Sequence, residues 1–200
     1  MSKKKVAVFG GTFDPPHLGH FIIAEQIKNK FDLQKIIFMP AGKPPHKNNN
    51  KISPDKDRCR MLKFVIDENE FFNLSDWELK QDGYSYTAKT IKEFVPELEA
   101  EEVFFIIGAD SLAEIFQWKK PEYILEKGKF IVFNRPGYNL KELLSKKRYQ
   151  PFLDNIFTYQ GVNIEISSSF IRSEIKKGNS IRYLTSDKIY NYIEENNLYR

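Results

Sequence analysis

The chain has 200 residues, of which 41% are hydrophobic and 14% aromatic, so it can build a sizeable core and is not intrinsically disordered. Its net charge of +4 is spread over short basic runs, which favours a small anionic ligand over nucleic acid. The single cysteine, Cys59, excludes an internal disulfide and a thiolate metal cluster. No apolar run reaches the ~18 residues of a membrane span and no cleavable signal is recognised, so we expect one cytoplasmic domain over residues 1–200 that does not bind membranes.

Short apolar runs alternate with helical patterns along the chain. Strands are expected where such a run ends at a glycine, a proline or a polar residue, namely at residues 5–9, 35–39, 73–80, 102–107, 129–133 and 163–166. Helices are expected at residues 18–30, 54–66, 87–94, 169–177 and 186–195. Ser53 is expected to cap the second helix with Pro54 in its first turn, Pro96 to stop the third, and Gly178 to end the fourth.

This alternation predicts an α/β fold, a Rossmann-like doubly wound parallel sheet with helices on both faces. Strands that are apolar throughout, rather than at every second residue, point the same way. The part from about residue 168 to 200 is expected to be a small C-terminal helical cap. Ligands of such sheets bind beyond the carboxyl ends of the strands, where Gly10, Pro40, Gly108, Asn134 and Ser167 fall.

The first strand leads into the sequence GGTFDPPHLGH, residues 10–20. Glycines after a strand let backbone N–H groups approach a ligand, and the next helix offers its positive end to phosphate. The spacing matches neither a dinucleotide GxGxxG nor a Walker loop. His17 and His20 lie three residues apart and face the same side of a helix. The alternatives are a helix cap and a zinc pair, but no third ligand stands at a suitable spacing.

A second motif, ISSSFIR, occupies residues 166–172. Consecutive hydroxyls at a helix N-terminus, with Arg172 three residues beyond the last serine, can bind a phosphate chain through N–H, O–H and guanidinium donors. The alternative is an ordinary helix cap with an exposed arginine. Two such motifs at the ends of separate strands make a phosphate site more probable than either alone.

Together the two motifs resemble the nucleotidylyltransferase superfamily, whose signature pairs HxGH with a distal SSxxIR-type motif. Between them lie AGKPPHK at residues 41–47, GYSYT at 83–87, FIIGADS at 105–111 with Trp118, and FNRPG at 133–137. In that order the set resembles bacterial nicotinate-nucleotide adenylyltransferases over nearly the whole chain. One departure is Lys89, which stands where an acidic residue is expected two positions after Thr87.

The resemblance implies transfer of the adenylyl group of ATP to nicotinate mononucleotide, which gives nicotinate adenine dinucleotide and pyrophosphate in NAD biosynthesis. It implies that the catalytic residues are His17, His20 and Arg172, with His20 at the α-phosphate. Asp110 is also a candidate helix cap, and Arg135 is either a triphosphate contact or a surface turn residue. The implied ATP contacts are Gly10, Gly11, Thr12, Phe13, His17, His20, Gly108, Asp110, Ser168, Ser169, Arg172 and Arg135.

Four residues are implied for the mononucleotide. Lys47 would close over its phosphate, Trp118 would stack on the pyridine ring, and Thr87 and the backbone near Lys119 would meet its carboxylate. Trp118 followed by two lysines is alternatively a surface cluster. Mg²⁺ is expected to arrive with ATP rather than in a protein cage, so no residue is assigned as a metal ligand.

Three other functions stay open at this point. The first is a related adenylyltransferase that acts on nicotinamide mononucleotide or phosphopantetheine, although the latter enzymes usually carry threonine where this chain has His17. The second is a nucleotide-binding regulatory module without catalysis. The third is an RNA-binding α/β domain, which would need exposed aromatics among basic residues. A homo-oligomer is neither predicted nor excluded.

Overall fold

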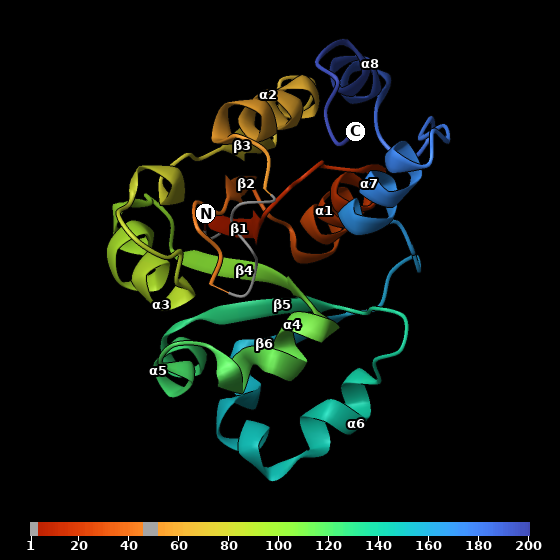
Figure 1. The fold of residues 1–200 in the computed structure, drawn as a ribbon. Helices are drawn as coiled ribbons and strands as arrows, with labels where there is room; N and C mark the ends of the chain where they lie inside the picture. Colours follow the sequence, from red (N-terminus) through yellow and green to blue (C-terminus); the bar gives the residue numbers. More distant parts are fainter. Residues whose placement is uncertain (1–3, 46–51) are drawn as a thin grey trace.

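A parallel sheet of six strands forms the centre of the computed structural model, which describes residues 4–45 and 52–200 (Figure 1). The strand order is β3-β2-β1-β4-β5-β6, and every neighbouring pair is parallel. The topological switch point of the sheet lies between β1 and β4. Sheets of this strand order bind ligands in the crevice at that point. The strands are β1 (Lys5–Gly11), β2 (Lys35–Pro40), β3 (Phe72–Leu74), β4 (Glu102–Gly108), β5 (Lys129–Phe133) and β6 (Ile156–Tyr159).

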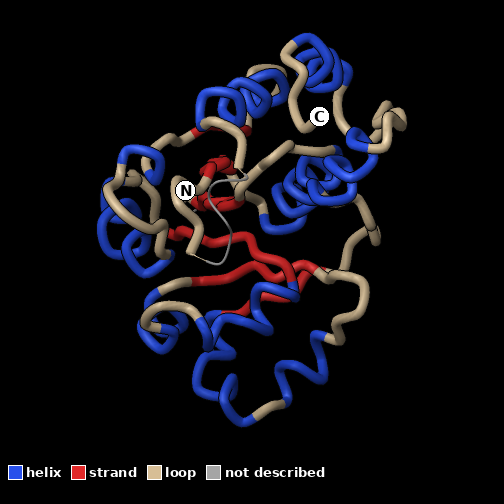
Figure 2. The backbone as a smooth tube through the Cα atoms, in the orientation of Figure 1, coloured by secondary structure: helices blue, strands red, loops and turns tan. Residues whose placement is uncertain are grey.

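Helices cover both faces of this sheet, as Figure 2 shows. Successive strand residues point to opposite faces, so Ala7 and Phe9 of β1 enter one core and Val6 and Val8 enter another. The first core is completed by α1 (Leu18–Phe31), α2 (Asp55–Ile66), α7 (Ser168–Lys176) and α8 (Asp187–Glu195). The second is completed by α3 (Thr87–Lys89), α4 (Ala109–Glu114), α5 (Pro121–Lys127) and α6 (Leu140–Ser145). The predicted doubly wound parallel sheet is confirmed.

The predicted helical part at residues 168–200 contributes to the same hydrophobic core as one face of the sheet. Ile171 and Ile175 of α7, with Ile189 and Ile193 of α8, belong to the same core as the strands. Gly178 follows α7 with φ of +74°, a conformation that glycine adopts without strain. No helix in residues 4–45 and 52–200 is long and apolar enough to cross a membrane.

The last predicted strand is wrong. Residues 163–166 have no regular structure, and the sixth strand is β6, which pairs with β5. Phe157 and Tyr159 of β6 both pack against Phe31, with ring centroids 6.5 Å apart in each case. The stretch that follows carries Val162, which is 58% exposed, and it runs over the surface to α7. Aromatic packing against α1 therefore placed the strand earlier in the chain.

Other predicted elements are shorter or begin elsewhere. The strand expected at 73–80 ends at Leu74 and gives way to a 3₁₀ turn at Glu78–Lys80. The helix expected at 87–94 is α3 followed by a π-helical turn, Thr90–Phe94, and Pro96 lies in the next 3₁₀ turn, Val95–Glu97. Sequence periodicity did not single out α4, α5 or α6. Nor did it indicate the 3₁₀ segments Ile115–Gln117 and Lys147–Asn155.

Two predicted helix caps are wrong. Pro54, not Ser53, is the residue before the first turn of α2, and the Ser53 N–H instead donates to Asp14 Oδ2 over 3.3 Å. Asp110 lies inside α4, whose capping position is Gly108, and its carboxylate accepts a hydrogen bond from the N–H of Ser111 over 2.9 Å. Ser53 thus makes a long-range backbone contact and Asp110 a local side-chain contact, and neither residue occupies the capping position.

Candidate active site

Two histidines meet at the start of α1. His17 precedes the first turn, and its backbone N–H donates a hydrogen bond to Nδ1 of His20 over 3.2 Å. The rings stack with centroids 3.6 Å apart and an interplanar angle of 26°. Because Nδ1 of His20 accepts a hydrogen bond, this nitrogen carries no proton, and the neutral ring is protonated on Nε2. The structure therefore brings the predicted pair together and also gives His17 the capping position.

Burial keeps His17 uncharged. The residue is 3% exposed, and burial together with the charge of Arg135 lowers its pKa to about 3. Nδ1 of this ring is buried without a hydrogen-bond partner among the described residues, a state that a bound ligand or water can relieve. A methyl group on Gly19 would lie 3.0 Å from the same atom, so the ring position depends on a glycine there.

Phe13 supports the histidine pair from the loop side. Its ring is 2% exposed and meets the ring of His20 edge-on, with centroids 5.0 Å apart. A methyl group on Gly11 would lie 3.0 Å from this ring. Gly10 and Gly11 pair with β2, so β1 continues through both glycines and the loop proper begins at Thr12. The glycines predicted as loop residues are thus strand residues, and Gly11 leaves room for the ring of Phe13.

The second motif docks on this loop through the N-terminus of α7. Arg172 donates from Nη1 to the carbonyl oxygen of Asp14 over 2.6 Å, and the Ser168 hydroxyl donates to the carbonyl of Pro15 over 2.8 Å. Ser167 caps α7 by accepting from the Phe170 N–H over 3.1 Å, and its hydroxyl lies 3.1 Å from that of Ser169. The two predicted phosphate motifs, more than 150 residues apart in sequence, are therefore one structural unit.

A third group of predicted residues lies at the ends of β4 and β5. Asp110 Oδ2 is 3.8 Å from Nε of Arg135, and this guanidinium lies 5.3 Å from the ring centroid of Phe133. Nε of Arg135 is buried and makes no hydrogen bond in the described part of the chain. A methyl group on Gly108 would lie 2.2 Å from Asp110 Oδ1, so a larger residue there would displace this carboxylate from its present position. Arg135 is thus held against the sheet rather than free in a surface turn.

The residues predicted for the pyridine ring line one cavity. Thr87, Trp118 and Lys119 surround a volume of about 360 Å³. Sequence reasoning missed the other lining residues, which are Pro45, Ser85, Tyr86, Gln117 and Ile124. Tyr86 could have been inferred from its place beside Thr87, and Nζ of Lys119 lies 4.4 Å from its ring centroid.

A short backbone segment after β2 joins the histidine loop to this cavity. The Ala41 N–H donates to the carbonyl of Gly11 over 2.8 Å, and the Gly42 N–H donates to Oγ of Ser85 over 2.9 Å. The backbone N–H of Ser85 in turn donates a hydrogen bond to the carbonyl of Lys43 over 2.9 Å. A methyl group on Gly42 would lie 2.7 Å from the Glu78 carbonyl, so this close passage also requires glycine. The two halves of the candidate site share one hydrogen-bonded frame.

Two further residues were singled out from the sequence, Lys47 and Lys89. Lys47, predicted to contact the mononucleotide phosphate, lies outside the described residues. Lys89, the departure from the family pattern, donates to Oε1 of Gln81 over 2.9 Å and lies 3.9 Å from a carboxylate oxygen of Glu93. The positive charge at this position therefore has local partners, and Lys89 is not one of the residues that line the cavity.

The strand order and the paired histidine and arginine motifs define a nucleotidyltransferase. Consistent with this, the family model described as cytidylyltransferase-like matches residues 8–174. The probable nicotinate-nucleotide adenylyltransferase of Desulfitobacterium hafniense strain Y51 is 41% identical over 199 residues, which cover 98% of this chain and 96% of the relative. The probable enzyme of Clostridium tetani has the same identity over 98% of this chain and its own full length. The chain belongs to the nicotinate-nucleotide adenylyltransferase family, and the predicted enzyme class is confirmed.

A solved structure agrees in fold. Plasmodium falciparum nicotinic acid mononucleotide adenylyltransferase complexed with NaAD superimposes with a TM-score of 0.82 at 21% identity. The match covers 98% of this chain and 97% of that one. The shared fold thus extends over the whole sheet and both helical layers.

Proposed function

We propose that this chain transfers the adenylyl group of ATP to nicotinate mononucleotide and releases pyrophosphate. The observation that carries the proposal is the docking of Arg172 and Ser168 on the loop that leads to His17 and His20. Donors from both ends of the chain then face one triphosphate. The cavity of Thr87, Trp118 and Lys119 is tied to the same loop by the segment after β2.

The reaction needs alignment and charge neutralisation more than it needs a base. The phosphate oxygen of the mononucleotide is already anionic, and it attacks the α-phosphorus in line with the departing pyrophosphate. Nε2–H of His20 donates to an α-phosphate oxygen, where negative charge builds up in the transition state. His17, kept neutral by burial, adds a hydrogen bond without repelling the cationic groups around it.

Arg172 holds the leaving group. One of its nitrogens is committed to the Asp14 carbonyl, which fixes the plane of the guanidinium. Its remaining N–H groups, with Ser169 and the N–H groups at the start of α7, bind the β- and γ-phosphates. Asp110 accepts hydrogen bonds from the ribose hydroxyls beside Gly108, and Arg135 adds positive charge at the same end of the sheet.

The cavity selects the pyridine. Trp118 stacks on the ring, while the Thr87 hydroxyl and the charge of Lys119 stabilise a carboxylate. A neutral amide would turn its own N–H groups toward these donors and leave hydrogen bonds unmade. The site therefore favours the acid over the amide. Lys47 remains proposed for the mononucleotide phosphate.

Mg²⁺ is proposed to enter with the triphosphate. Within the described part of the chain no three histidine, cysteine or acidic side chains are placed to hold a metal ion. The donor set around the histidines is instead cationic or neutral, which suits phosphate oxygens rather than a cation. No step above depends on a metal ion held by the protein.

A pyrophosphate-release assay tests the proposal. Purified protein with ATP is given nicotinate mononucleotide, nicotinamide mononucleotide or phosphopantetheine in turn, and the product is identified by mass. We expect nicotinate adenine dinucleotide in the first reaction at the highest rate. Turnover with phosphopantetheine alone, or with none of the three, would refute the proposal.

A further inference from the structure

A buried carboxylate lies in the loop between β1 and the histidines. Asp14 is 3% exposed, and its two carboxylate oxygens have different partners. Oδ1 accepts a hydrogen bond from the hydroxyl of Tyr199 over 2.7 Å, and Oδ2 accepts one from the backbone N–H of Ser53. A charge removed from water needs such partners to be stable. The side chain of Asp14 thus anchors the loop to two remote segments.

The same loop has its backbone carbonyls engaged by side chains. Arg172 binds the carbonyl of Asp14, and Arg58, which is 0% exposed, donates to the carbonyl of Thr12 over 2.8 Å. Ser168 binds the carbonyl of Pro15, and the Thr185 hydroxyl donates to that of Pro16 over 3.0 Å. Carbonyl oxygens repel phosphate, so turning them onto these donors makes the loop compatible with an anionic ligand.

Tyr199 reaches Asp14 because the segment after α8 folds back. The Leu198 N–H donates to the carbonyl of Ile193 over 3.1 Å, and the Tyr199 ring packs against the core under α1 and α7. Tyr199 has φ of +68°, a conformation that costs free energy in a residue other than glycine and persists only where contacts enforce it. Burial and the neighbouring Asp14 charge raise the pKa of Tyr199, so its hydroxyl stays a donor.

We propose that Tyr199 is a positioning residue of the phosphate site. Its hydroxyl fixes Asp14, whose carbonyl fixes the guanidinium of Arg172, so the loop and the arginine are held where a triphosphate binds. The inference rests on the proposed function insofar as ATP is the ligand. Neither Tyr199 nor Asp14 needs to touch the substrate for this effect.

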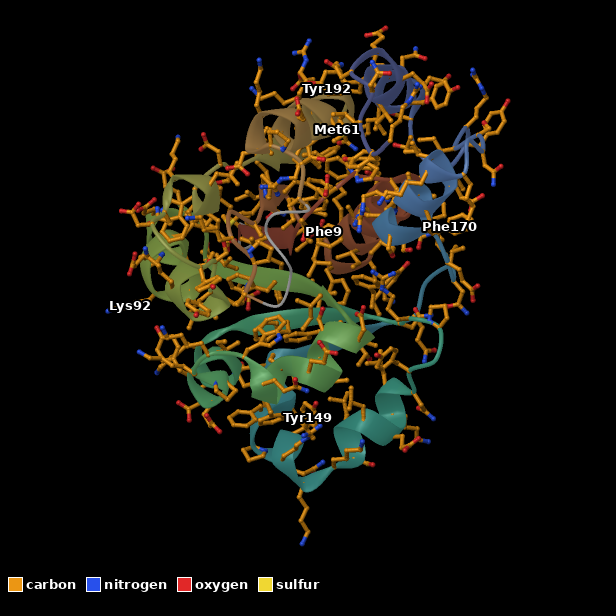
Figure 3. All side chains as sticks on the ribbon, viewed as in Figure 1. Phe9, Met61, Lys92, Tyr149, Phe170 and Tyr192 are labelled. Carbon is orange, nitrogen blue, oxygen red and sulfur yellow. The ribbon has the colours of Figure 1, made fainter. Side chains whose placement is uncertain are left out.

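The chain offers a matched control. Tyr192, on α8, donates from its hydroxyl to Asp57 Oδ1 of α2, also over 2.7 Å, and Figure 3 shows Tyr192 beside the helix that carries Met61. Tyr192→Phe therefore removes an equally short tyrosine–aspartate bond from the same region without touching the loop. Tyr199→Phe removes only the hydroxyl and keeps the ring in the core.

Steady-state kinetics of the two variants test the proposal. We expect Tyr199→Phe to raise the KM for ATP about tenfold, since a hydrogen bond to a charged group is lost, while the KM for nicotinate mononucleotide stays within about twofold. Tyr192→Phe should leave both constants within about twofold. Equal KM values for ATP in Tyr199→Phe and the wild type, whatever happens to the melting temperature or kcat, would overturn the positioning role.

Hydrogen exchange gives a second measurement that does not need turnover. In the unliganded protein, the backbone amides of residues 12–20 should exchange faster in Tyr199→Phe than in the wild type. In Tyr192→Phe their exchange rates should equal those of the wild type. Unchanged exchange in this peptide would overturn the anchor. A wild type without pyrophosphate release would refute the proposed function and leave this measurement as the decisive one for the anchor.

Discussion

His17 and His20 stack face to face, 3.6 Å between ring centroids, and the first histidine is buried and neutral while the second is held by the backbone of the first. Two charged imidazoles could not approach so closely in a buried site. The pair is therefore neutral, as the proposed role in binding one ligand through hydrogen bonds requires. From this relationship follow the first three predictions.

Replacing His20 by alanine should lower kcat by ~10²-fold or more, because it removes a donor at the position where charge develops. His20 is on the first turn of α1 and alanine favours helices, so the fold should persist. Single-turnover kinetics and circular dichroism check the two parts. A rate near that of the wild type would remove His20 from the mechanism.

The substitution Gly19→Ala should lower activity without lowering stability. Its methyl group would press on Nδ1 of His17, while alanine in place of glycine favours a helix by about 1 kcal/mol. We expect an unchanged or higher melting temperature with kcat/KM for ATP reduced roughly tenfold. A fully active Gly19→Ala enzyme would show that the ring of His17 need not keep its position.

The low pKa of His17 makes stability depend on pH. The unfolded chain binds a proton at this histidine near pH 6.5, whereas the folded chain does so only near pH 3, so acid favours unfolding over that window. Between pH 7.5 and pH 5 the wild type should lose about 2 kcal/mol more unfolding free energy than His17→Gln. Urea denaturation at the two pH values measures the difference. Parallel losses in both proteins would mean that His17 is not buried in its neutral form.

Thr87 and Trp118 should affect ring selection differently. Stacking does not distinguish acid from amide, so Trp118→Ala should reduce kcat/KM for both mononucleotides by similar factors. The Thr87 hydroxyl is proposed to donate to the carboxylate, so Thr87→Ala should reduce kcat/KM more for the acid than for the amide and narrow the ratio of the two roughly tenfold. Kinetics with both mononucleotides on both variants compare the effects directly. An unchanged preference in Thr87→Ala would exclude this hydroxyl from selection.

The sequence predicted the parts of the fold that local patterns determine. The strands β1, β2, β4 and β5 are apolar throughout and end near a glycine, a proline or Asn134, and they lie where the sheet is buried on both faces. The edge strand β6, Ile156–Tyr159, was missed although its β-branched and aromatic residues favour a strand, and residues 163–166, which include Asn163 and Glu165, were chosen instead. The packing of Phe157 and Tyr159 on Phe31, far away in sequence, could not be inferred from either stretch.

In the candidate site, too, the sequence indicated some residues and not others. His17, His20, Ser168 and Arg172 could be picked out because phosphate binding needs those residue types at helix N-termini. The groups that hold them could not, because their partners are set by the fold. Tyr199 and Asp14 are 185 positions apart, and nothing in the pattern around either residue indicates the other. Arg58 is likewise an unremarkable helical arginine until its carbonyl partner is known.

The most direct test of the central claim is the ratio of kcat/KM for nicotinate mononucleotide to kcat/KM for nicotinamide mononucleotide in the wild-type enzyme with ATP. Two unmade hydrogen bonds in the amide complex, at about 1–3 kcal/mol each, predict a ratio of at least ~30, since about 1.36 kcal/mol is a factor of ten. A ratio near one, or a preference for the amide, would contradict the assignment of the cavity around Trp118 to the acid.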